Sequence, residues 1–470
     1  MSTVTGTGNG TATASEKRLS LLRVLGPVHV WALGVGIVLV GEYMGWNFSV
    51  GKGGMIAGLV AAWIAGLLYT SVAMIDSEVT STVASAGGQY AQAKHIVGPL
   101  MAFNVGLFLV LAYTMLEAGN AITVGFLLDT VAQMQGHTGL NQKPFIILTV
   151  MFLAWLNYRG VLVTLNFSFI ITAIAFIAIV ILFFAVQGGI SAIPLDFSAI
   201  STEPLPYGWV GVLAALHFGL WYYLGIEGTT QAAEEVRSPS RALPYGTMAG
   251  IITLVIAATI TWYVCSGLIP WEYLGQAGTP LFDAARVTGS LWLMILLFIG
   301  TIFSTLASAN GCINDASRAW FAMGRDRYLP TWFGAVHPVY RTPYRAIVFL
   351  VPIALVFALG APLDQVITFS ILSGLLGYTF MSFNMIMFRN KWPLKSIKRG
   401  YVHPFHPLPA IVLMVLCAAT YVAIFLGYGT QLIAMMCYFI LVSLWFHFWR
   451  YRFVRRGDQF TMPWPRPQGY

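Results

Sequence analysis

The chain has 470 residues, of which 58% are hydrophobic and 9% are charged, and its mean hydropathy is +0.75. Soluble globular domains carry about 25% charged residues, so the composition excludes that class and indicates a polytopic membrane protein. The net charge of +8 invites a nucleic-acid partner. We expect none, because the basic residues lie in short segments between apolar runs.

Apolar runs long enough to cross a bilayer follow one another along the chain. The predicted twelve transmembrane spans lie near residues 28–50, 54–75, 98–130, 144–160, 164–187, 209–233, 246–269, 290–313, 346–361, 364–388, 408–427 and 430–449. Residues 1–20 are polar and rich in Ser, Thr and Gly, which predicts a disordered cytoplasmic tail and no signal peptide. Residues 451–470 form a second cytoplasmic tail.

The distribution of basic residues predicts how the chain is oriented. With the N-terminus inside, only Lys52, Lys143 and Arg286 among the 25 Lys and Arg residues fall in outer loops. The positive-inside rule therefore places both termini in the cytoplasm of a multi-pass cell-membrane protein in contact with the lipid bilayer.

Two spans are expected to break. The first holds four glycines between Gly34 and Gly45 together with Glu42, and the sixth holds Glu227 among Gly219, Gly225 and Gly228. Glycine and a carboxylate are both costly inside a membrane helix, so such a segment indicates unwound backbone that lines a cavity. Interrupted spans at matching places in the two halves are typical of secondary transporters built from inverted repeats.

The predicted division of the chain follows from this pattern. Residues 21–190 form the first inverted repeat, with helices 1–5, and residues 205–388 form the second, with helices 6–10. Residues 400–450 hold helices 11 and 12. Asp76 and Glu78 follow the second span and are interpreted as part of a polar turn.

Several sequence blocks resemble the amino acid, polyamine and organocation permeases. The blocks are EVTSTVASAGGQY, AEEVRSPSRALP, SRAWFAMGRDRYLP and Thr342-Pro343, and they occur in family order over nearly the whole chain. Within that superfamily, GEYMGWN and GLWYYLGIEGTTQAAEEV are most similar to the ethanolamine permease group. The resemblance implies a five-plus-five inverted repeat with helices 1 and 6 broken.

The resemblance also implies which residues bind substrate. It places Leu39, Val40 and Gly41 on the break of the first span, beside Glu42, and Trp221 at a gating position near Gly225. Glu227 matches an acid tied to proton dependence in relatives. The remaining substrate-contacting positions are Tyr113, Glu117, Ser308 and Cys312. A lysine that some relatives carry in the fifth span is absent here, which leaves the coupling mechanism open.

These residues predict the transport of a cation. Three carboxylates suit a small organic amine such as ethanolamine, whose ammonium group pairs with Glu117 or Glu227 while Tyr113 and Trp221 add cation–π contacts. Desolvation favours a protonated carboxyl, so Glu227 and Glu117 are proton-coupling candidates for a secondary active importer that works by alternating access. An amino acid permease of the same fold, as symporter or exchanger, is the alternative.

Other classes of function lack their sequence signals. The four cysteines lie in apolar runs without paired spacing, so neither a disulfide framework nor a metal site is expected. The chain carries no Gly-rich phosphate loop and no Gly-x-Ser-x-Gly motif, and we therefore expect neither an enzyme nor a cofactor.

Overall fold

The computed structural model describes residues 25–82, 87–137, 139–159, 161–231, 233 and 236–454. Within these ranges the chain is helical, and its one β-type contact is an isolated bridge between Leu25 and Val236. The predicted N-terminal tail and most of the predicted C-terminal tail lie outside the described residues.

The first half of the chain contains nine helices within the described ranges. They are α1 (Pro27–Val38), α2 (Val40–Tyr43), α3 (Asn47–Gly53), α4 (Met55–Thr82), α5 (Gly88–Ile96), α6 (Pro99–Met134), α7 (Lys143–Arg159), α8 (Val161–Gln187) and α9 (Ser198–Thr202). Both α1 and α6 begin at a proline, which suits the first position of a helix because its missing N–H has no intrahelical partner there.

The second half continues in the same style. Its α-helices are α10 (Gly208–Gly219), α11 (Pro239–Leu268), α12 (Trp271–Leu274), α13 (Pro280–Val287), α14 (Leu291–Arg325), α15 (Tyr344–Gly360), α16 (Leu363–Lys391) and α17 (Leu408–Phe448). Short 3₁₀ turns η1 (Leu220–Tyr222), η2 (Ile226–Thr230), η4 (Thr331–Gly334) and η5 (Arg450–Phe453) lie between or after them.

The predicted all-α polytopic architecture is confirmed. Eight helices in the described ranges are long and apolar enough to cross a membrane, and the bent pair 27–53 makes a ninth. The other three predicted spans correspond to α7, α15 and one half of α17. Helix α17 has 41 residues and one non-helical residue, Tyr428 (φ −139°, ψ 41°), which lies between the two predicted spans.

The first span is interrupted at the predicted place and bends mainly beyond it. Helix α1 ends at Val38 and α2 begins at Val40, and Leu39 between them has helical backbone angles. The axis then turns by 47° after Tyr43, where Met44 is extended and Gly45 has φ 88°. Regular helix is thus interrupted at Leu39, on the predicted break at Leu39, Val40 and Gly41, and the larger change of direction follows at Gly45, whose φ is positive.

The sixth span breaks as predicted, around Gly225. Helix α10 ends at Gly219, and the backbone then forms the two 3₁₀ turns η1 and η2. Gly225, between them, has φ 109°, a left-handed conformation that side chains rarely adopt. Both interrupted spans thus contain a glycine with positive φ within the non-α segment, Gly45 in the first and Gly225 in the sixth.

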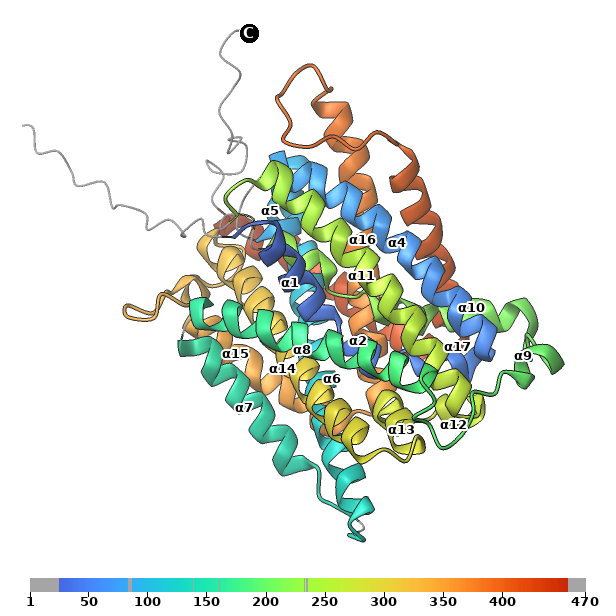
Figure 1. Ribbon diagram of the computed structural model, residues 1–470. Coiled ribbons are helices and arrows are strands. Elements are labelled where there is room, and N and C mark those ends of the chain that lie inside the picture. Colours follow the sequence, from blue (N-terminus) through green and yellow to red (C-terminus); the bar gives the residue numbers. More distant parts are fainter. Residues whose placement is uncertain are drawn as a thin grey trace, which may run out of the picture.

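The helices pack as one bundle (Figure 1). α5 lies at one end of the bundle, and α9, α12 and α13 lie at the opposite end. The interrupted α1 packs against α8, α11 and α14, so the bend lies inside the bundle. Large apolar side chains such as Trp63, Leu148 and Val356 are exposed on the outer helices, which is the surface that lipid contact requires.

A glycine-to-alanine change tests the tight packing of the first bend. A Cβ atom at Gly41 would lie 2.6 Å from the Trp221 carbonyl oxygen, so we expect G41A to lower the free energy of unfolding by about 1 to 3 kcal/mol. G360A is the matched control, because nothing lies within 4 Å of a Cβ there. Equal melting temperatures for the two purified variants would contradict this packing.

Candidate functional site

The interruptions of the first and sixth spans contact each other directly. Gly41 lies against the backbone of Trp221, and the Trp221 indole Nε1 donates a hydrogen bond of 3.0 Å to the Met44 carbonyl oxygen. A Cβ at Gly45 would also meet the Trp221 ring, at 2.7 Å. Trp221 is 2% exposed. The two bends are therefore held together by one tryptophan and by the absence of side chains on two glycines.

Glu227 lies at the second bend, among hydroxyl groups. The backbone N–H of Gly225 donates to its Oε2 at 3.2 Å. The carboxyl also interacts with the hydroxyl of Tyr378, which in turn donates to the Tyr69 hydroxyl at 3.2 Å. Tyr113 lies within electrostatic reach of Glu227, and its own hydroxyl has no hydrogen-bond partner in the described residues.

Glu117 lies on α6, opposite α14. It is 1% exposed, and its Oε1 atom has no hydrogen-bond partner in the described part of the chain. The Cys312 thiol of α14 interacts electrostatically with both Glu117 and Glu227. One turn earlier on the same helix, the Ser308 hydroxyl accepts a hydrogen bond of 2.9 Å from Asn120. The structure thus brings five predicted residues from three spans together: Tyr113, Glu117, Glu227, Ser308 and Cys312.

Glu42 belongs to a separate polar group. Its carboxylate is fully buried, and neither oxygen has a hydrogen-bond partner within the described ranges. Its charge acts on Tyr43, Tyr222 and Tyr223. Tyr222 stacks on Trp46, with ring centroids 5.5 Å apart. Of the three predicted carboxylates, Glu117 and Glu227 therefore both interact with Cys312, whereas Glu42 lies apart from them near the first bend.

The predicted residues Leu39 and Val40 are buried in the helical part of the first span. Gly41, Trp221 and Gly225 lie where the two bends meet. In this arrangement Gly41 serves close backbone packing, whereas Gly225 supplies a left-handed backbone conformation.

A fourth buried acid was not expected. Helix α4 continues to Thr82, so Asp76 lies inside a helix and not in the predicted polar turn. Its carboxylate accepts hydrogen bonds from Gln89 (3.2 Å) and Gln92 (2.9 Å) of α5. It also lies within electrostatic reach of Glu227. A polar residue after an apolar run looks like a turn in the sequence, and only burial identifies it as a part of the site.

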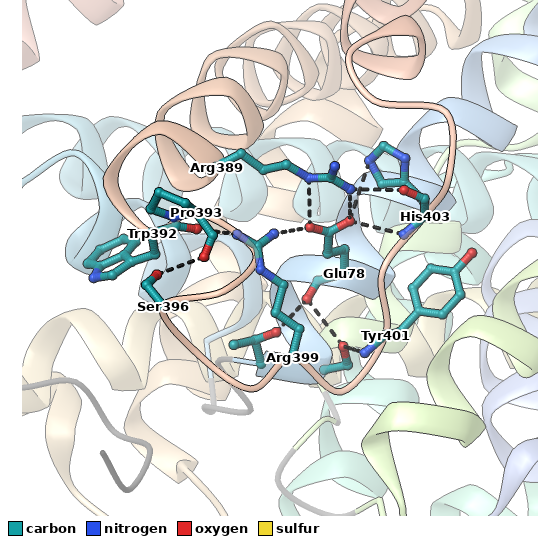
Figure 2. A network of polar contacts seen from close by, with 10 residues as sticks. Glu78, Arg389, Trp392, Pro393, Ser396, Arg399, Tyr401 and His403 are labelled. Atoms are coloured by element: carbon teal, nitrogen blue, oxygen red, sulfur yellow. Dashed lines mark hydrogen bonds and ion pairs between the residues drawn. The ribbon is translucent and has the colours of Figure 1, made fainter. Parts of the chain in front are cut away.

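Glu78, two residues later on α4, holds together a network at the α5 end of the bundle (Figure 2). Arg389, near the end of α16, donates two hydrogen bonds to its carboxylate, at 3.0 and 2.6 Å. Arg399 and the backbone N–H of His403 also donate to it. We call these four residues the Glu78 network. It fastens the loop 392–407 to the end of α4.

The described residues include no group of three or more His, Cys, Asp or Glu side chains placed to hold a metal ion. Nor does any Lys, Arg or His lie within 4.0 Å of the Glu42, Glu117 or Glu227 carboxylate in those ranges. What the site offers chemically is buried carboxylate and hydroxyl oxygen, which can accept hydrogen bonds from a cation that carries N–H donors.

Comparison with known proteins shows the family of the chain. The profile of a family described as amino acid permease matches residues 28–457. The chain belongs to this family. It is therefore a multi-pass membrane transporter and not an enzyme.

The names of individual relatives give different substrates or none. An uncharacterised transporter of Rhizobium meliloti is 83% identical over 98% of this chain and 99% of its own length. A methylthioribose transporter of Bacillus subtilis is 26% identical, covering 87% of this chain and 89% of its own. A branched-chain amino acid permease of the same bacterium is 25% identical, covering 86% and 88%.

The Glu78 network predicts a large stability effect. E78Q removes the buried carboxylate charge that two partly buried guanidinium groups share, and breaking a fully buried ion pair costs about 3 to 5 kcal/mol, which sets the upper limit here. We expect the melting temperature of purified E78Q to fall well below that of wild type. E203Q, at an exposed glutamate, is the control. A melting temperature for E78Q equal to that of E203Q would show that the network contributes nothing.

His403 predicts how stability depends on pH. Burial, together with the nearby Arg389, His406 and Arg399, lowers the pKa of His403 to about 4, although Glu78 acts in the opposite direction. As the pH falls from 6.5 towards 4, the unfolded chain binds a proton at His403 that the folded chain does not bind, so stability decreases. Above pH 6.5 this histidine contributes no pH dependence.

H403Q keeps a neutral polar side chain and removes the titration. Its melting temperature should fall less than that of wild type between pH 6.5 and pH 4.5, measured in the same buffers. Parallel curves for the two proteins over that interval would refute the lowered pKa.

Proposed function

We propose that this permease imports a small primary amine with no carboxylate, such as ethanolamine, by alternating access across the cell membrane. The observation that carries the proposal is the set of buried carboxylates beside the two bends, none of which has a Lys, Arg or His partner within 4.0 Å in the described ranges. A buried carboxylate without a cation is costly, and an ammonium substrate would relieve that cost.

The backbone at the bends supports a substrate without a carboxylate. Transporters that bind a carboxylate on interrupted helices use free backbone N–H groups at the start of a half-helix. Here the N–H of Gly45 donates to the Asn47 side chain, and those of Leu39, Glu42 and Met44 donate to carbonyl oxygens of the same span. At the second bend, the Gly225 N–H donates to Glu227.

Glu227 thus occupies the position that a substrate carboxylate would take at the second bend. A carboxylate in the substrate would compete with it for the same N–H group and would repel its charge. A primary amine has no such conflict, since its three N–H donors can be accepted by the unpartnered Oε1 of Glu117 and by the lone pairs that Glu227 has left. Aromatic faces at Tyr113 and Trp221 would add about 0.5 to 2 kcal/mol of cation–π stabilisation.

Proton coupling follows from the same chemistry. When the ammonium leaves, the carboxyl pair needs another positive charge, and a proton on Glu227 or Glu117 supplies it at the lowest cost. The hydroxyls of Tyr378 and Tyr69 form a hydrogen-bonded step next to Glu227. We infer that substrate and proton exchange on this carboxyl pair, which would make the carrier a symporter.

A second candidate is an amino acid permease with the same fold. It is favoured by the branched-chain amino acid permease that matches 86% of this chain. In that case the ammonium group of the amino acid would bind the same carboxylates. The two candidates differ in whether a carboxylate on the substrate helps or hinders binding, which a competition experiment can measure.

The orientation and the division of the chain are part of the proposal. Both termini would be cytoplasmic, because nearly all Lys and Arg residues then fall on the inner side. Residues 21–190 and 205–388 would be the inverted repeats, each with one interrupted span.

The proposal predicts the behaviour of E227Q in proteoliposomes. Uptake of labelled ethanolamine should fall at least about tenfold, because a hydrogen bond to a charged group contributes about 1.5 to 3 kcal/mol. E203Q, far from the bends, should transport like wild type. For the wild-type protein, uptake of labelled ethanolamine at a clamped membrane potential should stop when the proton gradient is collapsed.

Unlabelled ethanolamine should displace the label better than glycine, alanine or leucine does. If an amino acid competes better than ethanolamine, the proposed amine substrate is wrong, and the protein is better described as an amino acid permease.

A further inference from the structure

A polar cavity separate from the central site lies at the end of the bundle that carries α12 (Figure 1). Its volume is about 510 Å³, which is ample for a small organic molecule. Its walls come from α3, α12, the start of α16 and the kink of α17, and none of the residues discussed for the central site lines it. Its charged and aromatic lining residues include Lys52, Tyr207, Trp271, Glu272, Asp364 and Tyr428.

We call this cavity the outer pocket. Tyr428 lies at its centre. The non-helical backbone of Tyr428 interrupts α17, and its ring packs edge-on against His217, with ring centroids 5.2 Å apart. Its hydroxyl donates a hydrogen bond of 2.9 Å to the Asp364 carboxylate. A phenol that donates to a carboxylate has a more electron-rich ring, which strengthens its attraction for a cation.

The pocket already holds one ammonium group. Lys52 Nζ lies 5.2 Å from the centroid of the Tyr428 ring, within the range of a cation–π contact. Within the described residues, Lys52 has no carboxylate within 4.0 Å, although Asp364 and Glu272 line the same cavity. Lys52 is therefore held by the aromatic ring and not by an ion pair. The lining of the cavity contains two carboxylates, Asp364 and Glu272, for this one ammonium group.

We propose that this outer pocket is a second binding site for a small primary ammonium ion and that Lys52 is an internal competitor for it. The identity of the ligand rests on the proposed amine cargo. The incoming ammonium would take the position over Tyr428, near Asp364 and Glu272, while the flexible Lys52 side chain swings towards solvent. The excess of carboxylate over ammonium in the lining favours a cation over a zwitterion.

The position of the pocket gives it a role in transport. Phe218, which packs on Tyr428, lies three residues before Trp221 on the same span, and it also contacts Phe48 of the cavity wall. An ammonium ion over Tyr428 would therefore lie near Phe218, which is three residues before the tryptophan that joins the two bends. It would raise the local concentration of substrate before the central site opens.

The test measures equilibrium binding of labelled ethanolamine to the full-length purified protein. Proteins that carry E227Q lose the central site under the proposed function, so their remaining binding reports on the outer pocket. In this background K52Q should tighten binding roughly threefold to tenfold, the range of one cation–π contact. D364N should weaken it by a similar factor, and E203Q should leave it unchanged. A gain of affinity in K52Q cannot arise from misfolding.

The outcomes separate this proposal from the central one. If wild type transports ethanolamine but the E227Q protein shows no residual binding and K52Q changes nothing, the outer site is refuted and the amine cargo stands. If alanine binds the outer pocket more tightly than ethanolamine and K52Q abolishes that binding, the site is one for zwitterions and the proposal is wrong. If ethanolamine is neither transported nor bound, both proposals fail.

Discussion

The contact between the two interrupted spans is the constraint on which the rest of the structure depends. Gly41 brings one backbone against the carbonyl of Trp221, and the Trp221 indole returns a hydrogen bond to Met44. No other residue type at position 41 leaves room for that approach. Because each bend is fixed against the other, the carboxylates beside them, Glu42 and Glu227, occupy defined places instead of moving with loose loops.

The acids around the bends divide into two groups with different neighbours. Glu117 and Glu227 both interact with Cys312, and Glu227 also acts on Tyr113, whereas Glu42 acts on Tyr222 and Tyr223. If the cargo is the proposed amine, these two groups and the proposed outer pocket would form a series of positions for a cation along the bundle. A carrier for a positively charged solute gains from several weak positions, because each must release what it binds.

The sequence predicts the acids of the site better than their surroundings. Glu117 and Glu227 stand out because a carboxylate inside an apolar run is rare and costly, so its presence indicates function. Tyr69 and Tyr378 do not stand out, since 14% of the chain is aromatic and ring packing explains most such residues. Asp76 and Glu78 were interpreted as a turn because hydropathy alone cannot tell the end of a span from a helix that continues into protein.

The position of the first bend shows a second limit of sequence reasoning. Gly41 and Gly45 are both able to end a helix, and only the backbone angles show that Gly45 does so. The reason for a glycine at position 41 lies 180 residues away, in Trp221, and no local pattern reveals it. The all-helical architecture, in contrast, follows from composition and span length, because lipid leaves few alternatives for the backbone.

The Glu78 network carries a consequence for how the protein can move. The Glu78 carboxylate accepts hydrogen bonds from the last turn of α16 and from two residues of the loop 392–407. This one carboxylate therefore joins α4, α16 and that loop. Separating these segments would leave the guanidinium groups of Arg389 and Arg399 without the carboxylate that pairs with them. Any opening of the bundle at the α5 end must therefore carry these three segments as one rigid block, and the line of separation has to run elsewhere between the helices.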